Sequence, residues 1–440
     1  MPNDFSHVFN ATKYSERLFN RRKDINLGFD LLKNGFVTPD IARDSDIIVG
    51  KGAGDCDVLR VQGGVYTKEC TFVGGTNLYR EFGPELNNQW EGYSLDIESL
   101  MPAYSNDKII YLGLFISCWG HLITDCLRRI WFLLSNTYKN DYRDYKLAYT
   151  IREWGNNKIP SNFWDILEIL NIDCNNLVRI EKPTRYSEII IPNESLWHKD
   201  GELYYTKEYW NTINIIREYA KENAHGSNND KIFFKRDNNN RYVDSEDYVS
   251  DFFKRNGYRI INPGKINIKT QLSLLIRCKN FASVAGSTSH NCLFLHNEAE
   301  LILIQRNDTI DEYQLMLMDL MKNQKTVFFD SSWSFFRIGL KRNRFIIGEE
   351  LMDYFNTPDN MKRRYRRKNL TILYQYIKYC INMEDISDSE LSPEYYRKIL
   401  CEIAECREGV DRGRIVLLYK IVSIIDRISF RIGRIIPDKN

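Results

Sequence analysis

The feature that most constrains the fold of this 440-residue chain is a strand that leads directly into a helical pattern, within residues 108–134. Residues Lys108–Gly113 form an apolar, β-branched run of the kind found in buried strands. After Gly120 the apolar residues recur at helical spacing and fall on one face: Leu122, Ile123, Cys126, Leu127, Ile130, Leu133 and Leu134. Because such strand–helix alternation recurs along the chain, we expect an α/β protein with parallel sheets.

The opposite face of this helical pattern carries ionisable residues. His121, Asp125 and Arg128 share that face, and Arg129 lies at its edge. His121 and Asp125 are four residues apart, which is close enough for contact on a helix. In the functional interpretation, either His121 is a general base oriented by Asp125, or Asp125 is the base and His121 its partner. In the alternative interpretation, this is an outer helix face whose charges are solvated.

Cys118 stands three residues before His121, a spacing that suggests a nucleophilic Cys–His pair. Its apolar neighbours favour an inert, buried thiol instead. The ten cysteines of the chain are scattered, and buried thiols in a reducing compartment account for them better than disulfides or zinc ligands.

The order of strand and helix patterns predicts four regions. Residues 1–95 are a mixed region joined to the first domain, and they contain two Asp-X-Asp triplets, at 44–46 and 55–57, which we interpret as loop carboxylates. Residues 96–224 and 230–335 form two α/β domains, joined by the polar stretch Ala224–Asp230. Residues 340–440 form a basic, helical extension.

The second α/β domain contains a predicted site for two linked phosphates. A strand ends at Val284-Ala-Gly286, and a helix is expected to start near Ser287, where free N–H groups would bind an anion. Lys235, Arg236 and Arg241 follow the first strand of the same domain. Since ligands bind at the carboxyl ends of parallel strands, we expect these groups to converge on a diphosphate.

Composition gives only weak limits on binding partners and location. The net charge of +2 gives no overall attraction to nucleic acid. A basic run at Lys362–Lys368 and a basic amphipathic pattern over Asp411–Ile436 are consistent either with an anionic membrane surface or with a helix packed on the domains. No signal-peptide pattern or bilayer-spanning run is visible. We therefore expect a cytoplasmic protein, peripheral at the inner face of the membrane.

Three segments, in order, resemble glycosyltransferase family 61. Trp119–Trp131 is similar to the histidine segment of the family, with an acidic residue four positions on. Ile232-Phe-Phe-Lys-Arg236 with Arg241 is similar to its strand followed by two arginines. The segment from Gly257 through Gln271 to Phe294 resembles its glycine-rich turn, although only Gly286 is present where many members carry a second glycine. Together the matches cover about residues 108–306.

The resemblance implies a GT-B-like arrangement, with two Rossmann-like domains facing across a cleft. It implies inverting transfer of a sugar from a nucleotide-diphosphate sugar, with UDP as the expected nucleotide, to a glycan or lipid-linked glycan of a surface polysaccharide. His121 and Asp125 would be the catalytic residues, and neither a metal nor another cofactor is expected. The donor-binding residues would be Lys235, Arg236, Arg241, Gly286, Ser287, Ser289 and Asn291.

Two alternative functions are consistent with parts of the sequence. His121 and Asp125 match the HxxxD spacing of acyltransferases that use coenzyme A, but Cys126 stands where those enzymes carry glycine, and the second domain would have no role. A non-catalytic relative that binds glycan or scaffolds an assembly complex would keep the two domains without turnover.

Overall fold

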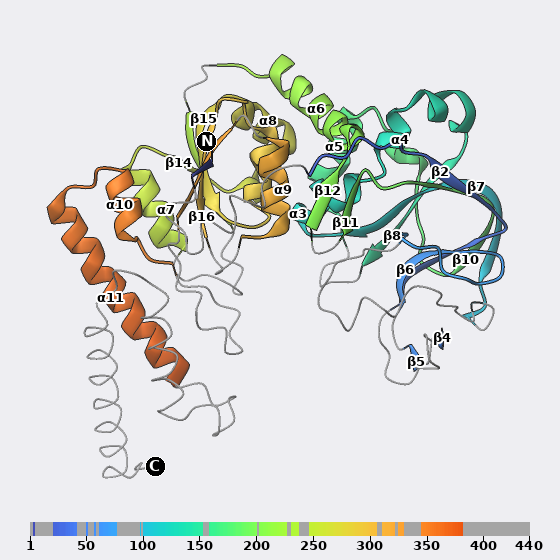
Figure 1. Ribbon diagram of the computed structural model, residues 1–440, viewed down its shortest axis with the longest axis horizontal. Coiled ribbons are helices and arrows are strands. Elements are labelled where there is room, and N and C mark those ends of the chain that lie inside the picture. Colours follow the sequence, from blue (N-terminus) through green and yellow to red (C-terminus); the bar gives the residue numbers. More distant parts are fainter. Residues whose placement is uncertain are drawn as a thin grey trace, which may run out of the picture.

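A computed structural model describes ten segments of the chain and a few isolated residues. The segments are 21–41, 61–76, 100–152, 158–199, 202–226, 230–236, 246–305, 310–321, 324–329 and 345–381, with short pieces at 3–4, 50–51, 57–58 and 97. Several predicted features lie outside the described residues: Arg241, three of the four aspartates of the Asp-X-Asp triplets, and the basic pattern at 411–436. The mixed α/β class predicted from the sequence is confirmed, with one large sheet in each half of the molecule (Figure 1).

The first sheet is built around the long strand β7 (Ala103–Ile116), which contains the predicted strand at Lys108–Gly113. Four parallel strands lie in the order β10-β7-β8-β9, and three antiparallel strands extend the sheet beyond β10. The other strands are β2 (Phe29–Lys33), β3 (Phe36–Ile41), β6 (Val61–Tyr66), β8 (Lys146–Arg152), β9 (Leu177–Arg179) and β10 (Thr184–Pro192). The sheet is therefore mixed, and only its four-stranded part is parallel.

Helices cover the first sheet on the side that faces the second half. The segment after β7 forms α3 (Trp119–Ile123), the 3₁₀ helix η2 (Asp125–Leu127) and α4 (Trp131–Leu134), followed by the π-helix η3 (Tyr138–Tyr142). Beyond these come α5 (Ser161–Ile169), the 3₁₀ helix η4 (Cys174–Asn176), the hairpin β11 (Leu196–Lys199) with β12 (Glu202–Tyr205), and α6 (Lys207–Glu222). Thr206 begins α6 as its N-cap, because its side chain accepts a bond from the Glu208 amide.

The second sheet is parallel in all its described strands, as predicted, in the order β1-β17-β16-β15-β13-β14. Its strands are β13 (Asp230–Phe234), β14 (Arg259–Ile261), β15 (Cys278–Val284), β16 (Glu300–Ile304), β17 (Lys325–Phe329) and β1 (Asn3–Asp4). The connecting helices are α7 (Glu246–Arg255), η5 (Pro263–Lys265), α8 (Ile268–Ile276), η6 (Ser289–Phe294) and α9 (Glu312–Leu320). Because β1 pairs with β17 while β2, β3 and β6 join the first sheet, the N-terminal region contributes to both sheets.

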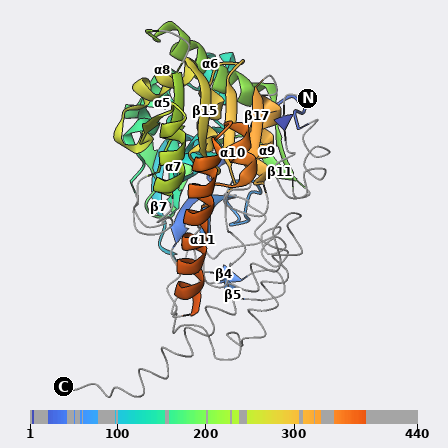
Figure 2. The same cartoon turned by 90° about the vertical axis from the view of Figure 1, so that its left-hand side faces the viewer.

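In the part of the chain that the structure describes, two helices follow the second sheet, α10 (Glu349–Tyr354) and α11 (Asp359–Ile381). Figure 2 shows α11 extending away from the sheet. The basic run Lys362–Lys368 lies on α11, with Arg363 and Arg364 exposed and Tyr365 buried against the domain. None of the helices that the structure describes has both the length and the apolar character needed to cross a bilayer.

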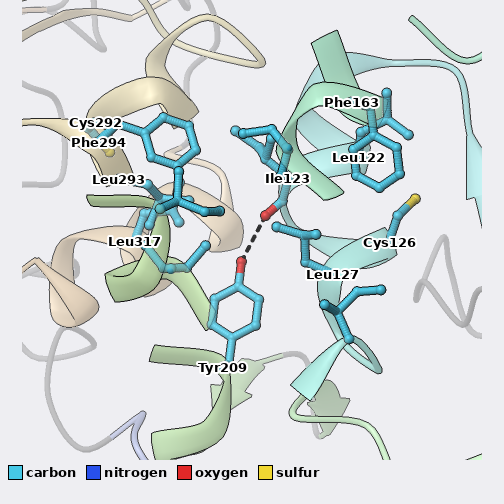
Figure 3. Packing of buried hydrophobic residues seen from close by; sticks show 14 of the residues in the cluster. Leu122, Ile123, Cys126, Leu127, Phe163, Tyr209, Cys292, Leu293, Phe294 and Leu317 are labelled. Carbon is cyan, nitrogen blue, oxygen red and sulfur yellow. Dashed lines mark hydrogen bonds between the residues drawn. The ribbon is translucent and has the colours of Figure 1, made fainter. Parts of the chain in front are cut away.

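One hydrophobic core spans both halves of the molecule. Leu122, Ile123 and Leu127 of the first half belong to the same buried cluster as Leu293 and Leu317 of the second half (Figure 3). Tyr209 of α6 lies between them and donates a hydrogen bond to the Ile123 carbonyl at 3.0 Å. A second cluster, on the other face of the second sheet, contains only residues of that half and of α10 and α11. The junction between the halves is therefore hydrophobic core.

Candidate active site

The segment after β7 is a broken helix, where the sequence pattern predicted a continuous one. The break lies at Thr124, whose backbone angles (φ −106°, ψ −75°) depart from helical values. The Thr124 hydroxyl donates to the Gly120 carbonyl at 2.7 Å, and Arg128 Nε donates to the Asp125 carbonyl at 2.8 Å. Ser195 supplies its amide and its hydroxyl to the Arg128 carbonyl. Side chains and the Ser195 amide thus donate hydrogen bonds to carbonyl oxygens that would accept from backbone amides in a regular helix.

His121 and Asp125 are in contact, as their spacing predicted. His121 Nδ1 lies 2.7 Å from Asp125 Oδ2. The interpretation as a solvated helix face is wrong, because Asp125, Arg128 and Arg129 are all buried. The protein retains these charges in its interior by pairing them.

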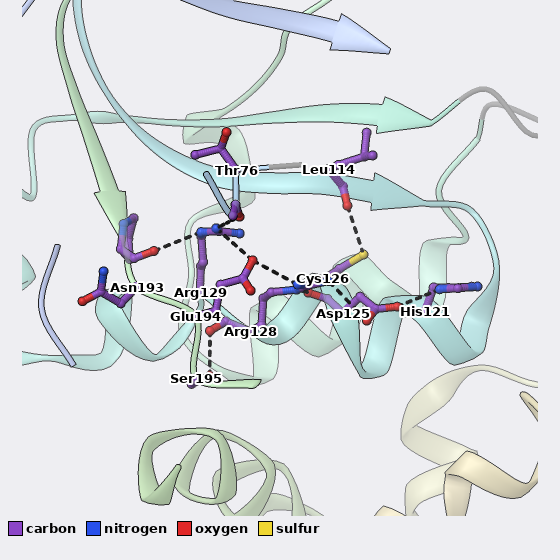
Figure 4. A network of polar contacts seen from close by, with 12 residues as sticks. Thr76, Leu114, His121, Asp125, Cys126, Arg128, Arg129, Asn193, Glu194 and Ser195 are labelled. Atoms are coloured by element: carbon purple, nitrogen blue, oxygen red, sulfur yellow. Dashed lines mark hydrogen bonds and ion pairs between the residues drawn. The ribbon is translucent and has the colours of Figure 1, made fainter. Parts of the chain in front are cut away.

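Glu194, which follows β10, is the second carboxylate of this buried cluster (Figure 4). Its Oε1 lies 3.0 Å from Arg128 Nη1 and 3.0 Å from Arg129 Nη2. Arg128 Nη2 also reaches Asp125 Oδ1 at 3.2 Å, and Arg129 Nε donates to the Pro192 carbonyl at 3.0 Å. The charges of two carboxylates and two guanidinium groups therefore balance one another in the buried cluster that contacts His121.

The pKa values of these groups follow from burial and from their neighbours. Burial tends to lower the pKa of Arg128, but the carboxylates of Glu194 and Asp125 outweigh it and raise the pKa above its usual value. Burial lowers the pKa of Arg129, and the nearby charge of Arg128 adds to that effect. Burial, and then the charge of Asp125, raise the pKa of the Tyr209 phenol. Arg128 therefore remains a cation, and its charge favours the ionised form of Asp125.

Accessibility distinguishes the two members of the pair. The side chain of His121 is 13% exposed, whereas that of Asp125 is 0% exposed. In the tautomer that this contact favours, Nδ1–H donates to the carboxylate and Nε2 carries the basic lone pair. Of the two side chains, that of His121 has surface open to an approaching molecule, and Asp125 can orient the ring and stabilise an imidazolium.

The start of α3 packs directly against the turn that follows β15 in the second half. A Cβ atom at Gly120 would lie 2.8 Å from Ser287 Oγ and 3.0 Å from His290 Nδ1, so only glycine permits this approach. Trp119 Nε1 donates to Asn291 Oδ1 at 3.1 Å across the same junction. The structure therefore brings the His121–Asp125 pair next to the predicted donor-binding turn.

Ser289 and Asn291 shape this turn from within. Gly286 has φ +126°, a conformation that favours glycine. Ser289 Oγ lies 3.1 Å from the Gly286 amide and 2.7 Å from its carbonyl, and Asn291 Nδ2 donates to the Thr288 carbonyl at 2.9 Å. Both side chains are fully buried, whereas Ser287 is half-buried.

The expected helix beginning near Ser287 is instead the short 3₁₀ helix η6, which starts at Ser289. The prediction of a helix here was correct in place but wrong in type. A helix of this length has little macrodipole, so a bound anion would depend on individual N–H groups and side chains.

Two of the predicted cations, Lys235 and Arg236, lie at the same sheet edge as the turn but are already paired. Phe234 and Ser283 are register partners, so Lys235 and Arg236 emerge beside the strand that leads to Gly286. Lys235 Nζ contacts Asp247 Oδ1, and Arg236 Nε lies 3.0 Å from Glu246 Oε2. Arg236 Nη2 is buried and has no hydrogen-bond partner among the described residues.

Cys118 does not behave as predicted. The thiol is exposed and lies 3.3 Å from Ser287 Oγ, whereas Cys126, Cys278 and Cys292 are buried as expected. Burial raises the pKa of Cys278 and of Cys292 to about 12. The interpretation of Cys118 as a core thiol is therefore wrong, because β7 ends two residues earlier, at Ile116, and releases the chain to the surface.

Sequence reasoning missed two residues that complete the site. Glu194 follows an apolar strand in a polar stretch, and nothing in that stretch marks it as the partner of two arginines. Tyr313 lies in α9 and donates to Asp125 Oδ1 from 188 residues away in the chain. Only the three-dimensional fold reveals such partners. Within the described residues, no group of three or more His, Cys, Asp and Glu side chains is arranged to hold a metal ion.

Comparison with known proteins agrees with this geometry. Residues 119–302 match the family Glycosyltransferase 61, a range that starts at α3 and ends within β16. It contains His121, Asp125, the cations after β13 and the Gly286 turn. No curated protein matches the chain significantly. The match assigns residues 119–302 to glycosyltransferase family 61, and this domain identifies the chain as a glycosyltransferase.

Proposed function

We propose that the protein transfers a sugar, with inversion at the anomeric carbon, from a nucleotide-diphosphate sugar to a hydroxyl group of a glycan acceptor. The observation that carries this proposal is the His121–Asp125 pair next to the Gly286 turn, with Nδ1 and Oδ2 2.7 Å apart. A base on one half adjoins the expected phosphate site on the other, so the sugar would lie between them. We expect UDP to be the nucleotide.

In the proposed reaction, His121 Nε2 takes the proton of the acceptor hydroxyl as its oxygen attacks C1 of the sugar. The bond between C1 and the diphosphate oxygen breaks on the opposite face, and the nucleoside diphosphate leaves with the electron pair. This single displacement inverts C1. Asp125 stabilises the imidazolium that forms, and general-base catalysis of this kind contributes about 10²–10⁴-fold to the rate.

Charge on the leaving diphosphate would be stabilised by cations and backbone N–H groups of the second half. Arg236 supports this assignment, because its Nη2 is buried without a partner among the described residues. Lys235, Arg241 and the Gly286–Ser287 backbone complete the proposed donor set. Ser289 and Asn291 would act indirectly, because they hold the turn in place. The proposal requires no metal ion.

A GT-B-like arrangement is part of the same proposal. Its support is a parallel sheet in the second half and a four-stranded parallel portion in the first, with the candidate site where the halves meet. We propose a growing surface polysaccharide, free or lipid-linked, as the acceptor. The acyltransferase and non-catalytic alternatives are set aside, since the family match supports a glycosyltransferase and extends through β13, β14 and β15 of the second sheet into β16.

The test is to measure binding of a panel of nucleotide sugars to the purified chain by calorimetry, and then turnover with glycan acceptors. We expect one nucleotide sugar to bind and to yield a product of inverted anomeric configuration by NMR. His121→Gln should keep donor binding and lower kcat by about 10²-fold or more. If no nucleotide sugar binds, or if the product retains its configuration, the proposal is wrong.

We propose a cytoplasmic location at the inner membrane face, supported by the exposed basic side of α11. Cosedimentation with vesicles containing phosphatidylglycerol tests this directly. Arg363→Ala with Arg364→Ala, and separately deletion of residues 411–440, should each weaken binding. Equal binding by all three proteins would rule out the membrane proposal.

A further inference from the structure

Helix α9 of the second half contacts both parts of the candidate site through two consecutive residues. Tyr313 Oη donates to Asp125 Oδ1. Gln314 Oε1 accepts a hydrogen bond from Ser289 Oγ at 2.6 Å, and Ser289 in turn holds Gly286. Consecutive helical residues point about 100° apart, so one short helix can contact two different elements.

Within the described residues, Tyr313 is one of three groups that contact the Asp125 carboxylate. His121 occupies Oδ2, while Tyr313 and Arg128 both donate to Oδ1. With Oδ1 held in this way, the other oxygen is directed at the imidazole. Second-layer hydrogen bonds of this kind fix the orientation and the basicity of the group they support. Because the Asp125 side chain is fully buried, water cannot replace a lost donor there.

We propose that Tyr313 is a positioning residue for the His121–Asp125 pair, so that the base on the first half is completed by a hydroxyl group from the second. This inference rests on the proposed function. It also means that α9 links the donor turn to the base: Ser289 and His290 of η6 contact Gln314 and Tyr313 respectively. The His290 and Tyr313 rings are stacked, with centroids 6.2 Å apart.

The chain offers a matched control for the Tyr313 hydroxyl. Tyr205 donates its hydroxyl to Asp319 Oδ2 at 3.0 Å, across the same junction and to the same helix α9. Its bond is a tyrosine–aspartate contact like that of Tyr313, but it touches neither His121 nor Asp125. Tyr→Phe at either position removes one hydroxyl and keeps the ring, so the contacts of Tyr313 with His198 and His290 are preserved.

The experiment compares Tyr313→Phe with Tyr205→Phe in the full chain. We expect Tyr313→Phe to lower kcat about ten-fold, since one buried hydrogen bond to a charged group is worth about 1.4 kcal/mol or more, with donor KM changed less than two-fold. Tyr205→Phe should leave both constants unchanged. Equal kcat values for the two variants would overturn the proposal.

A pH profile separates positioning from a general loss of stability. Among the described residues, the ionisable groups that face Asp125 include His121 from α3, Arg128 after η2, Tyr209 from α6 and Tyr313 from α9, with Glu194 behind Arg128. When Asp125 loses one hydrogen-bond donor, its carboxylate keeps more negative charge and stabilises the His121 imidazolium more strongly. The acidic limb of kcat against pH should therefore move to higher pH in Tyr313→Phe alone. Lower stability with an unmoved limb would contradict a positioning role.

Gln314→Leu probes the other contact of α9. It removes the acceptor of Ser289 and should raise donor KM more than it lowers kcat, the reverse of Tyr313→Phe. Failure of the proposed function has a different signature, since the wild-type chain would then turn over no nucleotide sugar. In that case NMR titration of the His121 ring still tests the role of Tyr313. Tyr313→Phe should shift the midpoint of that titration, and Tyr205→Phe should not. An unchanged midpoint in both variants would refute the inference.

Discussion

Glu194 is the residue on which the buried charges of the first half depend. It is the carboxylate shared by Arg128 and Arg129, whose side chains are only 6% and 4% exposed. Glu194→Gln keeps the shape but removes the charge, and Arg129 would then have no carboxylate among its contacts in the described structure. Removing one partner of a buried ion pair costs about 3–5 kcal/mol. We expect a loss near the lower value, about 3 kcal/mol, because Arg128 keeps Asp125.

Urea denaturation measures this loss, and Glu218→Gln is its control. Glu218 pairs with Lys221 on the surface of α6, with side chains 49% and 42% exposed. An exposed pair of this kind contributes little, so its loss should change the free energy of unfolding by less than about 0.5 kcal/mol. Similar values for the two variants would show that the Glu194 cluster does not stabilise the fold.

Cysteine reactivity provides a second prediction for single residues. Cys118 is exposed, whereas Cys278 and Cys292 are buried with a pKa raised by burial to about 12. Iodoacetamide under native conditions should therefore label Cys118 and spare the other two, as measured by mass spectrometry of peptides. Cys118→Ser should retain turnover, because His121 is bonded to Asp125. Loss of turnover in that variant would instead support the interpretation of Cys118 and His121 as a nucleophilic pair.

Sequence spacing predicted contacts within one element and missed those between elements. His121 and Asp125 are one helical turn apart, so their contact followed from 3.6-residue periodicity. Glu194 and Tyr313 meet the same cluster only because β10 and α9 pack beside it, and no local pattern records that packing. The burial of Arg128 was missed for the same reason, since it depends on Glu194.

At the scale of elements, the approach of α3 to the Gly286 turn depends on a residue without a side chain. Gly120→Ala would normally stabilise a helix by up to about 1 kcal/mol. Here the added Cβ would lie 3.1 Å from Ser287 Cα as well as against Ser287 Oγ, and backbone cannot move aside cheaply. We expect destabilisation by about 1–3 kcal/mol, together with weaker donor binding.

Thermal unfolding and calorimetry with the donor measure both effects of Gly120→Ala. Gly74→Ala is the matched control, because a Cβ there would meet no described atom within 4 Å. We expect that variant to unfold and bind as the wild type does. A stabilised Gly120→Ala protein would mean that the junction is looser than the structure indicates.

The sequence predicted the individual helices and strands better than it predicted how the strands pair. The strands and most helices follow from apolar periodicity, because burial on one face is what that pattern encodes. The direction of pairing in the first sheet does not follow from it: β2, β3 and β6 are antiparallel additions, and a short apolar run gives no sign of its neighbour. The broken helix after β7 also escaped prediction, since Ser195, which takes the Arg128 carbonyl, is remote in sequence.

At the scale of the molecule, the two halves share one hydrophobic core. The cluster that contains Leu122 and Leu127 continues through Leu293 to the second sheet. Polar bonds cross the same junction: Asn162 Nδ2 donates to the Ile266 carbonyl at 3.2 Å, and Arg217 Nη1 donates to the Leu293 carbonyl at 2.9 Å. Separating the halves would expose this core to water, which is unfavourable by about 25 cal/mol per Å² of apolar surface. We therefore expect both halves to unfold together.

Tryptophan fluorescence can test this cooperativity, because every tryptophan except Trp333 precedes residue 224 and reports on the first half. Ile302 lies in the cluster that belongs only to the second half and α10–α11, and it is fully buried. Ile302→Ala should destabilise that half by about 2–5 kcal/mol. If the molecule is one cooperative unit, the fluorescence midpoint in urea must fall as well, although no tryptophan is described near the mutation. The exposed Leu31→Ala should leave the midpoint in place. An unchanged fluorescence midpoint in Ile302→Ala, with an earlier loss of far-UV circular dichroism, would instead mean that the halves unfold independently and that the shared core contributes little to their association.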